Sequence, residues 1–206
     1  MANDETLEDA YAMTSLDEVK ALYRDWAFSY DAGFGDAQGY QLPRLVAQAY
    51  LAAGGHSAVL DVGAGTGLVA DHLVGAGLDT IDALDVSDEM LAVAKMKDIY
   101  RDLYNRDVTQ SLDLPAYDGV VSAGTFTLGH VGPSAIVNLL EVTKSGAVFV
   151  ISVNAAHYET AGFAAQMDML GTQIEGLTLT DVRIYDDRSD AAHRYDMARL
   201  LVFKKA

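Results

Sequence analysis

The sequence contains no cysteine, which excludes disulfide bonds, thiolate metal sites and cysteine nucleophiles. It also lacks an apolar run of the roughly 18–20 residues that a membrane-spanning helix needs. Residues 1–9 are acidic and polar, so they do not have the composition of a secretory signal. Together these absences favour a cytoplasmic protein that does not enter a membrane.

Basic residues are scarce as well, with 14 Lys and Arg against 30 Asp and Glu and a formal net charge of −16. Proteins hold nucleic acids largely through phosphate groups, and a chain of this charge repels them on average. No cluster of Lys or Arg interrupts the acidic balance, so we expect a small-molecule substrate and no nucleic-acid partner. The length of 206 residues suffices for a single large domain with a buried core.

The first quarter of the chain has helical patterns. Residues 15–30 predict a helix, because Ser15 and Glu18 have the spacing of a capping box. A loop at residues 31–39 separates it from a second predicted helix at residues 41–53, which ends at a pair of glycines. These patterns predict a helical segment ahead of the strands.

Strands and helices alternate along the rest of the chain. The predicted strands are residues 58–62, 80–85, 99–104, 119–122, 147–153, 177–185 and 198–204. The predicted helices are residues 68–74, 87–97, 134–143 and 157–170. Such alternation is typical of an α/β protein whose mostly parallel sheet is covered on both faces. Residues 186–197 leave no room for a good crossover helix, so we expect the last two strands to pair antiparallel.

Three glycines stand at alternate positions in the stretch from Val59 to Ala70, VLDVGAGTGLVA. They lie between a predicted strand and a predicted helix, where turn amides and the helix N-terminus form a site for an anion or a nucleotide. Ligands of such sheets bind at the carboxyl ends of the strands. The loop has no lysine and is not a P-loop, and Leu68 stands where the dinucleotide fingerprint has glycine or alanine. A nicotinamide-dependent oxidoreductase therefore stays as an alternative only.

The string from Asp61 to Gly67, DVGAGTG, resembles the first motif of class I S-adenosylmethionine-dependent methyltransferases. Companion motifs follow in the order of that family: Asp85 with VSDEML behind it, Asp107 with Val108, and YDGVVS at residues 117–122. The resemblance covers about residues 55–155. It implies a Rossmann-like, doubly wound sheet with one antiparallel strand near the C-terminus, S-adenosylmethionine as cofactor, and methyl transfer to an oxygen, nitrogen or carbon of a small molecule.

The resemblance also implies a role for each motif residue. Asp61 would hold the amides of the glycine loop, and Asp85 would accept both ribose hydroxyls. Val86 and Met90 would lie near the adenine ring, and Asp107 would accept a hydrogen bond from its amino group. The complete implied set is Trp26, Tyr30, Asp61, Gly63, Ala64, Gly65, Gly67, Asp85, Val86, Met90, Asp107, Val108, Ser122, Ala123 and Gly124, of which the last three would meet the methionine half through backbone atoms.

Two further stretches resemble parts of methyltransferases that act on small molecules. Residues 23–31, YRDWAFSYD, are similar to a helix that folds over the cofactor. This similarity implies that residues 1–53 form a lid on a core at residues 55–206, with Trp26 and Tyr30 at the methionine end. Packing of these aromatic side chains against the domain is the alternative. Residues 122–133, SAGTFTLGHVGP, resemble the narrower Williams–Beuren-region 27-like group.

The five histidines have no spacing that indicates a metal site. His130 follows the predicted fourth strand and His157 the fifth, on the side where a substrate binds in this architecture. Either could serve as a general base near neutral pH, with His130 the first candidate. The alternative is a loop histidine without a catalytic role. For the whole chain, a protein that binds the cofactor without catalysis is a further alternative.

Overall fold

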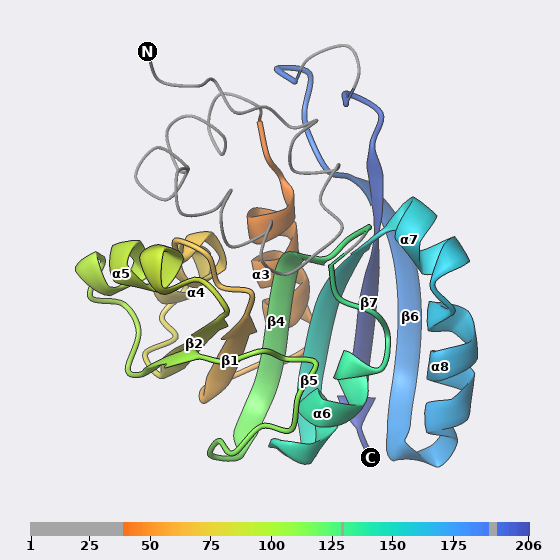
Figure 1. Ribbon diagram of the computed structural model, residues 1–206, viewed down its shortest axis with the longest axis horizontal. Coiled ribbons are helices and arrows are strands. Elements are labelled where there is room, and N and C mark those ends of the chain that lie inside the picture. Colours follow the sequence, from red (N-terminus) through yellow and green to blue (C-terminus); the bar gives the residue numbers. More distant parts are fainter. Residues whose placement is uncertain (1–38, 129, 190–192) are drawn as a thin grey trace.

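The computed structural model describes residues 39–128, 130–189 and 193–206. Within them, seven strands form one sheet of order β3-β2-β1-β4-β5-β7-β6 (Figure 1). The strands are β1 Val59–Val62, β2 Ile81–Asp85, β3 Leu103–Asn105, β4 Tyr117–Phe126, β5 Thr143–Asn154, β6 Ile174–Arg183 and β7 Met197–Lys205. β1 to β5 pair in parallel, and β7 is antiparallel to both β5 and β6. The predicted mostly parallel α/β sheet with one antiparallel strand near the C-terminus is confirmed.

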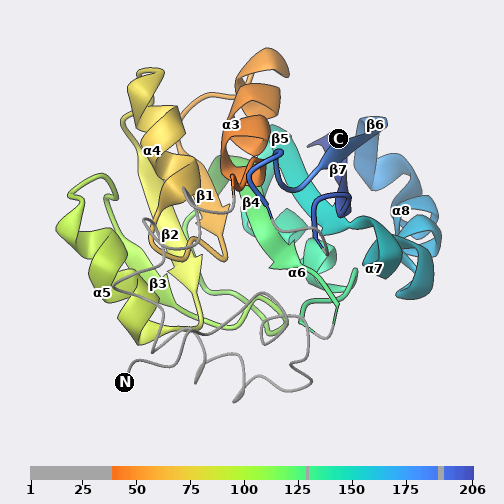
Figure 2. The same ribbon diagram turned by 90° about the horizontal axis from the view of Figure 1, so that it is seen from above.

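Helices cover both faces of the sheet (Figure 2). One face packs against α3 Leu42–Ala52, α4 Leu68–Gly75 and α5 Asp88–Met96. The other packs against α6 Ala135–Glu141, α7 Ala155–Thr160 and α8 Phe163–Leu170, and η2 Gly171–Gln173 leads into β6. Every residue of β1 is buried, because this central strand has neighbours on both edges and both faces. No helix in the described part of the chain has the length and apolar character to cross a membrane.

Tyr50 fixes α3 on the sheet. Its side chain is fully buried, and a Cβ built on Gly119 of β4 would lie 2.0 Å from the Tyr50 hydroxyl oxygen. The hydroxyl donates a hydrogen bond to the carbonyl of His56, 2.7 Å away, at the start of the turn into β1. Only glycine at position 119 leaves room for this ring. α3 is therefore held where its preceding residues reach the carboxyl edge of the sheet.

β4 and β5 are longer than predicted and β6 is shifted, and two further elements differ for reasons that the structure shows. β3 begins at Leu103 rather than at residue 99, because Tyr100 turns away from the strand path and points to β1. The helix predicted over residues 157–170 is two helices, α7 and α8, which meet at Gly162 with φ of +83°. A single α-helix cannot continue through a left-handed residue, so α8 starts in a new direction.

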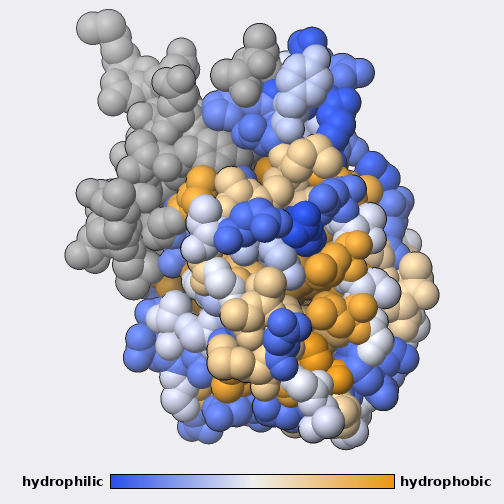
Figure 3. All heavy atoms as spheres, turned by 90° about the vertical axis from the view of Figure 1, so that its right-hand side faces the viewer, coloured by the Kyte–Doolittle hydropathy of each residue, from blue (hydrophilic) through white to orange (hydrophobic). Residues whose placement is uncertain are grey.

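β6 forms an exposed edge of the sheet. Most of its residues are exposed, including Leu177 and Leu179, and Met169 of α8 is exposed as well. Figure 3 views the molecule from the side of this edge and shows hydrophobic residues interspersed with hydrophilic ones. The pairing with β7 shifts register between Glu175 and Thr178. Such a bulge twists an edge strand and makes it a poorer template for pairing with another chain.

A buried carboxylate ties β2 to β4. Asp82 of β2 is fully buried and accepts hydrogen bonds from Arg101 Nε at 2.9 Å and Nη2 at 2.5 Å. It also accepts from the amide of Asp102 at 3.2 Å and from the hydroxyl of Tyr117 at 2.7 Å. A buried charge without such partners is strongly destabilising. The network therefore fixes the segment before β3 against the middle of the sheet.

Removal of the Arg101 guanidinium tests how much this network contributes to the stability of the fold. In Arg101→Met, Asp82 keeps its burial but loses its charge partner, which costs roughly 3–5 kcal/mol for a fully buried pair. Because the Arg101 side chain is 44% exposed, we expect about 2 kcal/mol of lost unfolding free energy, measured by urea denaturation. Arg106→Met is the control, since Arg106 is exposed and its side chain bonds only the Asn105 carbonyl among described residues, while its backbone amide, which the substitution keeps, donates to the carbonyl of Asp85. Equal losses in the two variants would contradict a special role for the Asp82 pair.

Candidate functional site

The glycine loop joins β1 to α4 at the carboxyl edge of the sheet. The amides of Gly63 and Ala64 both donate to the carbonyl of Leu84, at 2.8 and 3.1 Å, and the amide of Gly67 donates to the carbonyl of Ala64 at 2.9 Å. The loop is therefore folded back over the end of β2. Its backbone lies beside Asp85, the last residue of that strand.

Positions 63 and 65 are glycine for different physical reasons. Gly63 has φ of +64°, and a Cβ there would lie 1.9 Å from Oγ1 of Thr125. Gly65 has φ of +55°, but a Cβ there would meet nothing within 4 Å. Gly63 is thus closed against the end of β4, whereas Gly65 faces open space. A ligand can approach the backbone at Gly65, as the sequence predicts for the cofactor.

Asp85 links the glycine loop to the start of α5. Its Oδ2 accepts a hydrogen bond from the amide of Gly65 at 2.8 Å, and its Oδ1 accepts one from the amide of Ser87 at 2.9 Å. Burial raises the pKa of Asp85, and the backbone amides of Ser87, Gly65 and Val86 oppose this effect. Each carboxylate oxygen can accept a second hydrogen bond. The geometry therefore leaves Asp85 able to accept the two hydroxyls of a ribose, its predicted role.

Asp61 does not hold the loop amides, so that part of the prediction is wrong. The amides of Gly63 and Ala64 donate to the carbonyl of Leu84, and the amide of Gly65 donates to the carboxylate of Asp85. Asp61 is fully buried instead, and its Oδ2 accepts a hydrogen bond from the hydroxyl of Tyr100 at 2.7 Å. Its Oδ1 is buried without a hydrogen-bond partner among the described residues. Asp61 is therefore a buried acid of the site rather than a group exposed to a ligand.

Electrostatics at Asp61 favour the neutral acid. Burial raises the pKa of Asp61 to about 7, the hydrogen bond from Tyr100 lowers it, and the charges of Asp85 and Asp71 raise it further. Burial also raises the pKa of Tyr100, so its hydroxyl stays protonated and donates. The loop between α5 and β3 thereby supplies the group that keeps Asp61 partly ionised near neutral pH.

Tyr100 is a site residue that sequence reasoning missed. Its ring lies against Gly67, where a Cβ would come within 3.0 Å of the ring. The residue stood inside the predicted strand 99–104, and an isolated tyrosine gives no local signal that it reaches another strand. Its contact with Asp61 joins residues 39 positions apart.

The predicted adenine contacts gather at the ends of β2 and β3. The side-chain amide of Asn105 donates to the carbonyl of Val86 at 3.3 Å and to Asp88 Oδ1 at 2.7 Å. Met90 of α5 and Val108 are buried, 1% and 3% exposed, and Val108 packs in the core on the α6 side of the sheet. Asp107 is partly exposed and accepts hydrogen bonds through Oδ1 from the amide and hydroxyl of Thr109. Asn105 thus ties the end of β3 to Val86 and the start of α5, and the assignment of Val86, Met90, Asp107 and Val108 to the adenine stays a prediction.

The predicted methionine contacts lie at the end of β4. The hydroxyls of Ser122 and Thr125 both donate to the carbonyl of Val62, at 2.8 and 3.0 Å. The amide of Gly124 donates to Oγ of Ser152 on β5 at 3.1 Å. These bonds hold the ends of β1, β4 and β5 together. The backbone of Ala123 and Gly124 is partly exposed there, next to the glycine loop.

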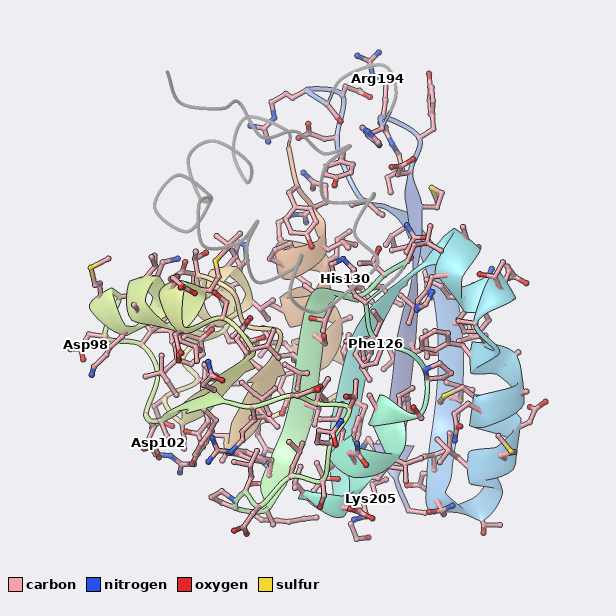
Figure 4. The ribbon with its side chains drawn as sticks, viewed as in Figure 1. Asp98, Asp102, Phe126, His130, Arg194 and Lys205 are labelled. Carbon is pink, nitrogen blue, oxygen red and sulfur yellow. The ribbon has the colours of Figure 1, made fainter. Side chains whose placement is uncertain are left out.

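The two histidines occupy different surroundings. His157 is buried, its Nε2 lies 2.9 Å from the carbonyl of Val131, and its ring meets Phe163 edge-on at 5.3 Å. Because a carbonyl only accepts, Nε2 carries the proton, and His157 anchors the loop after β4 to α7. His130 lies in that loop, partly exposed, near the upper end of the sheet (Figure 4). The geometry favours His130 over His157 as a group that could meet a substrate.

The predicted lid is represented only by its last part. Trp26 and Tyr30 lie outside the described residues. α3, the described helix of residues 1–53, packs on the sheet through Val46, Ala47 and Tyr50. In the described ranges, no group of three or more His, Asp or Glu side chains is arranged to hold a metal ion.

Sequence comparisons give two curated relatives. A family model described as a methyltransferase domain matches residues 59–146. The chain is 35% identical over 145 residues to the demethylmenaquinone methyltransferase of Renibacterium salmoninarum, covering 66% of this chain and 58% of that protein. It is 32% identical over 151 residues to methyltransferase-like protein 27 of Homo sapiens, covering 69% of this chain and 60% of that protein. The chain thus spans less than two thirds of the length of either relative.

Solved structures share the fold at low identity. The N-methyltransferase NodS of Bradyrhizobium japonicum, in complex with S-adenosylhomocysteine, has a TM-score of 0.67 and 14% identity, over 90% of this chain and 97% of that chain. The [4+2]-cyclase SpnF has a TM-score of 0.64 and 20% identity, over 91% of this chain and 96% of that chain. At these identities the likeness concerns the fold.

The raised pKa of Asp61 predicts a pH dependence of stability in the absence of ligand. The folded pKa of about 7 lies above the unfolded value of about 3.9. The folded state therefore holds an extra proton between these values, so stability falls as pH rises from about 4 to about 7 and then levels off. Asp61→Asn removes this dependence, and we expect it to be more stable than wild type at pH 8 by on the order of 2 kcal/mol, but not at pH 4.

Urea denaturation across this pH range measures the effect. Tyr100→Phe provides the second arm, because it removes the hydrogen bond that lowers the pKa of Asp61. The fall in stability should then extend to higher pH than in wild type. Parallel pH profiles for wild type and Asp61→Asn would show that Asp61 titrates normally.

Proposed function

The chain belongs to the class I S-adenosylmethionine-dependent methyltransferases, and we propose that it transfers the methyl group of this cofactor to an oxygen, nitrogen or carbon nucleophile of a small molecule. Membership in this class confirms the resemblance seen in residues 61–67. The observation that carries the proposed activity is the pairing of Asp85 with the amide of Gly65, which sets an acidic acceptor beside an open stretch of loop backbone.

The cofactor, when bound, supplies an electrophilic methyl group on a sulfonium ion. In our proposal, Asp85 accepts hydrogen bonds from the ribose hydroxyls, and Asp107 accepts one from the adenine amino group. Val86 contacts the adenine ring. The backbone of residues 63–67 and of residues 122–124 borders the methionine half. On the sequence pattern alone, Trp26 and Tyr30 close this end from the N-terminal segment.

The protein's contribution to the rate is mainly alignment of the two reactants in a site that excludes water. A base is needed only where the nucleophile is protonated and poorly acidic. We assign this role first to His130, which would take the proton from the acceptor atom as its bond to the methyl carbon forms. His157 is the second candidate, since its Nε2 is already engaged with Val131.

The proposed acceptor is small and largely apolar or aromatic. The last residues of β4, Thr125 and the buried Phe126, and the next two residues, Thr127 and Leu128, include no charged side chain, and Leu128 is 38% exposed. One relative is named for a demethylmenaquinone substrate, which is compatible with such an acceptor. The sequence and fold support no narrower choice.

A non-catalytic or differently reactive cofactor-binding protein is the second candidate function. A specific observation favours keeping it: SpnF, named as a [4+2]-cyclase, shares this fold. Methyl transfer also demands few side chains, so the described residues are compatible with binding alone. Binding of the cofactor without turnover on a broad panel of acceptors would support this second function.

Cofactor binding is the first test. We expect S-adenosylmethionine to bind wild type with micromolar affinity by isothermal titration, and NAD not to bind. Asp85→Asn should weaken binding by roughly 10- to 100-fold, because hydrogen bonds to a charged acceptor are worth about 1.5–3 kcal/mol. Asp88→Asn is the matched control: Asp88 is exposed and bonds Asn105 rather than the glycine loop.

The outcomes separate the alternatives. Binding of NAD without binding of S-adenosylmethionine would contradict the methyltransferase proposal and support the oxidoreductase alternative. Unchanged affinity in Asp85→Asn would remove Asp85 from the site while leaving the cofactor in place.

The assignment of the base has its own test once an acceptor is found. We expect His130→Ala to lower turnover by about 10²- to 10⁴-fold with unchanged affinity for the cofactor. His157→Gln, which can still donate to Val131, should retain most of the turnover. The opposite pattern would exchange the two roles, and normal turnover in both variants would mean that neither histidine is the base.

A further inference from the structure

Tyr40 lies in the short segment before α3, and hydrogen bonds hold this segment along the loop that follows β6. The amide of Gln41 donates to the carbonyl of Ile184 at 2.8 Å, and the amide of Asp186 donates to the carbonyl of Gly39 at 2.9 Å. Tyr40 thereby forms an antiparallel bridge with Tyr185. The side-chain amide of Gln41 adds bonds to the carbonyl of Gly39 and to Asp186 Oδ2. The backbone of Tyr40 is therefore fixed from both sides.

Packing fixes the direction of the Tyr40 side chain as well. Its ring lies 5.8 Å from the ring of Tyr185, tilted by 40°. Both belong to an apolar cluster with Leu42, Ile184 and Ala123. Because Ala123 belongs to β4, this cluster reaches across from the segment before α3 to the carboxyl end of that strand.

The hydroxyl of Tyr40 ends at Gly124. A Cβ built on Gly124 would lie 2.5 Å from the Tyr40 oxygen, closer than any side chain can approach. Gly124 also has φ of +81°, a conformation that side chains rarely adopt. The hydroxyl thus takes the place that a side chain at position 124 would have.

This position adjoins the proposed methionine end of the cofactor site. Gly124 precedes Thr125, whose side chain packs on Gly63 of the glycine loop. The amino-acid end of S-adenosylmethionine carries one carboxylate and one ammonium group. A phenol hydroxyl can donate to the first and accept from the second. A fixed tyrosine at the end of β4 has the chemistry that this end of the cofactor requires.

We propose that the Tyr40 hydroxyl is a binding group for the amino-acid end of S-adenosylmethionine, an inference that rests on the proposed function. Tyr40 is held in place before the cofactor arrives, because its backbone is bridged and its ring is packed. A pre-positioned side chain loses little rotamer freedom on binding. The sequence alone gave Tyr40 no role.

The test compares two ligands that differ at the amino-acid end. S-adenosylhomocysteine carries this end, and 5′-methylthioadenosine lacks it while it keeps the ribose and the adenine. We expect Tyr40→Phe, measured by direct and competitive isothermal titration, to weaken S-adenosylhomocysteine roughly tenfold. Binding of 5′-methylthioadenosine should stay within about twofold of wild type. The phenylalanine ring preserves the packing, so the melting temperature should stay close to that of wild type.

Two variants calibrate this result. Tyr185→Phe loses a hydroxyl in the same cluster, but no contact of its hydroxyl with Gly124 is seen, and it should bind both ligands as wild type does. Asp85→Asn should weaken both ligands, since both carry the ribose. Normal binding of S-adenosylhomocysteine to Tyr40→Phe, or equal weakening of both ligands, would overturn the proposal for Tyr40. Failure of wild type to bind S-adenosylmethionine would instead count against the proposed function itself.

Discussion

The hydrogen bond from the amide of Gly65 to the carboxylate of Asp85 joins the ends of β1 and β2 at the edge where the site lies. It works only because the two strands are parallel neighbours in register, Val62 beside Leu84, so their ends meet at the same level. The same carboxylate bonds the amide of Ser87 and so leads into α5. The glycine loop, the start of α5 and the proposed ribose site all depend on this one contact.

A second constraint is the burial of two carboxyl groups, those of Asp61 and Asp85, beside the glycine loop. Asp61 and Asp85 lie close enough for the charge of one to raise the pKa of the other. Tyr100 is the one described side chain that offers Asp61 a hydrogen bond, and Oδ1 is left unmatched. Such an arrangement lowers the stability of the unliganded protein. Polar groups that destabilise the fold in this way are common where a ligand binds.

The end of β4 joins the cofactor region to the substrate side. Thr125 packs against the glycine loop, and its hydroxyl donates to the carbonyl of Val62. The amide of Gly124 bonds Ser152 of β5, and the hydroxyl of Tyr40 lies against Gly124. The loop that follows β4 carries His130. His157 anchors that loop through Val131. The groups proposed for binding and for proton transfer are therefore parts of one connected edge, held by strand pairing on one side and by the loop after β6 on the other.

The sequence by itself determined the alternation of strands and helices, the antiparallel last pair, the glycine loop and the position of Asp85 at a strand end, because local patterns and short spacings encode all of these. The tertiary structure decided which residues surround the loop. Tyr100 reaches Asp61, Thr125 reaches Val62 and Tyr40 reaches Gly124 across long stretches of chain. No local pattern announces such contacts, since they arise only when parallel strands place their ends together. For the same reason His157 looked like a second base in the sequence, and only the folded chain shows its Nε2 held by a carbonyl.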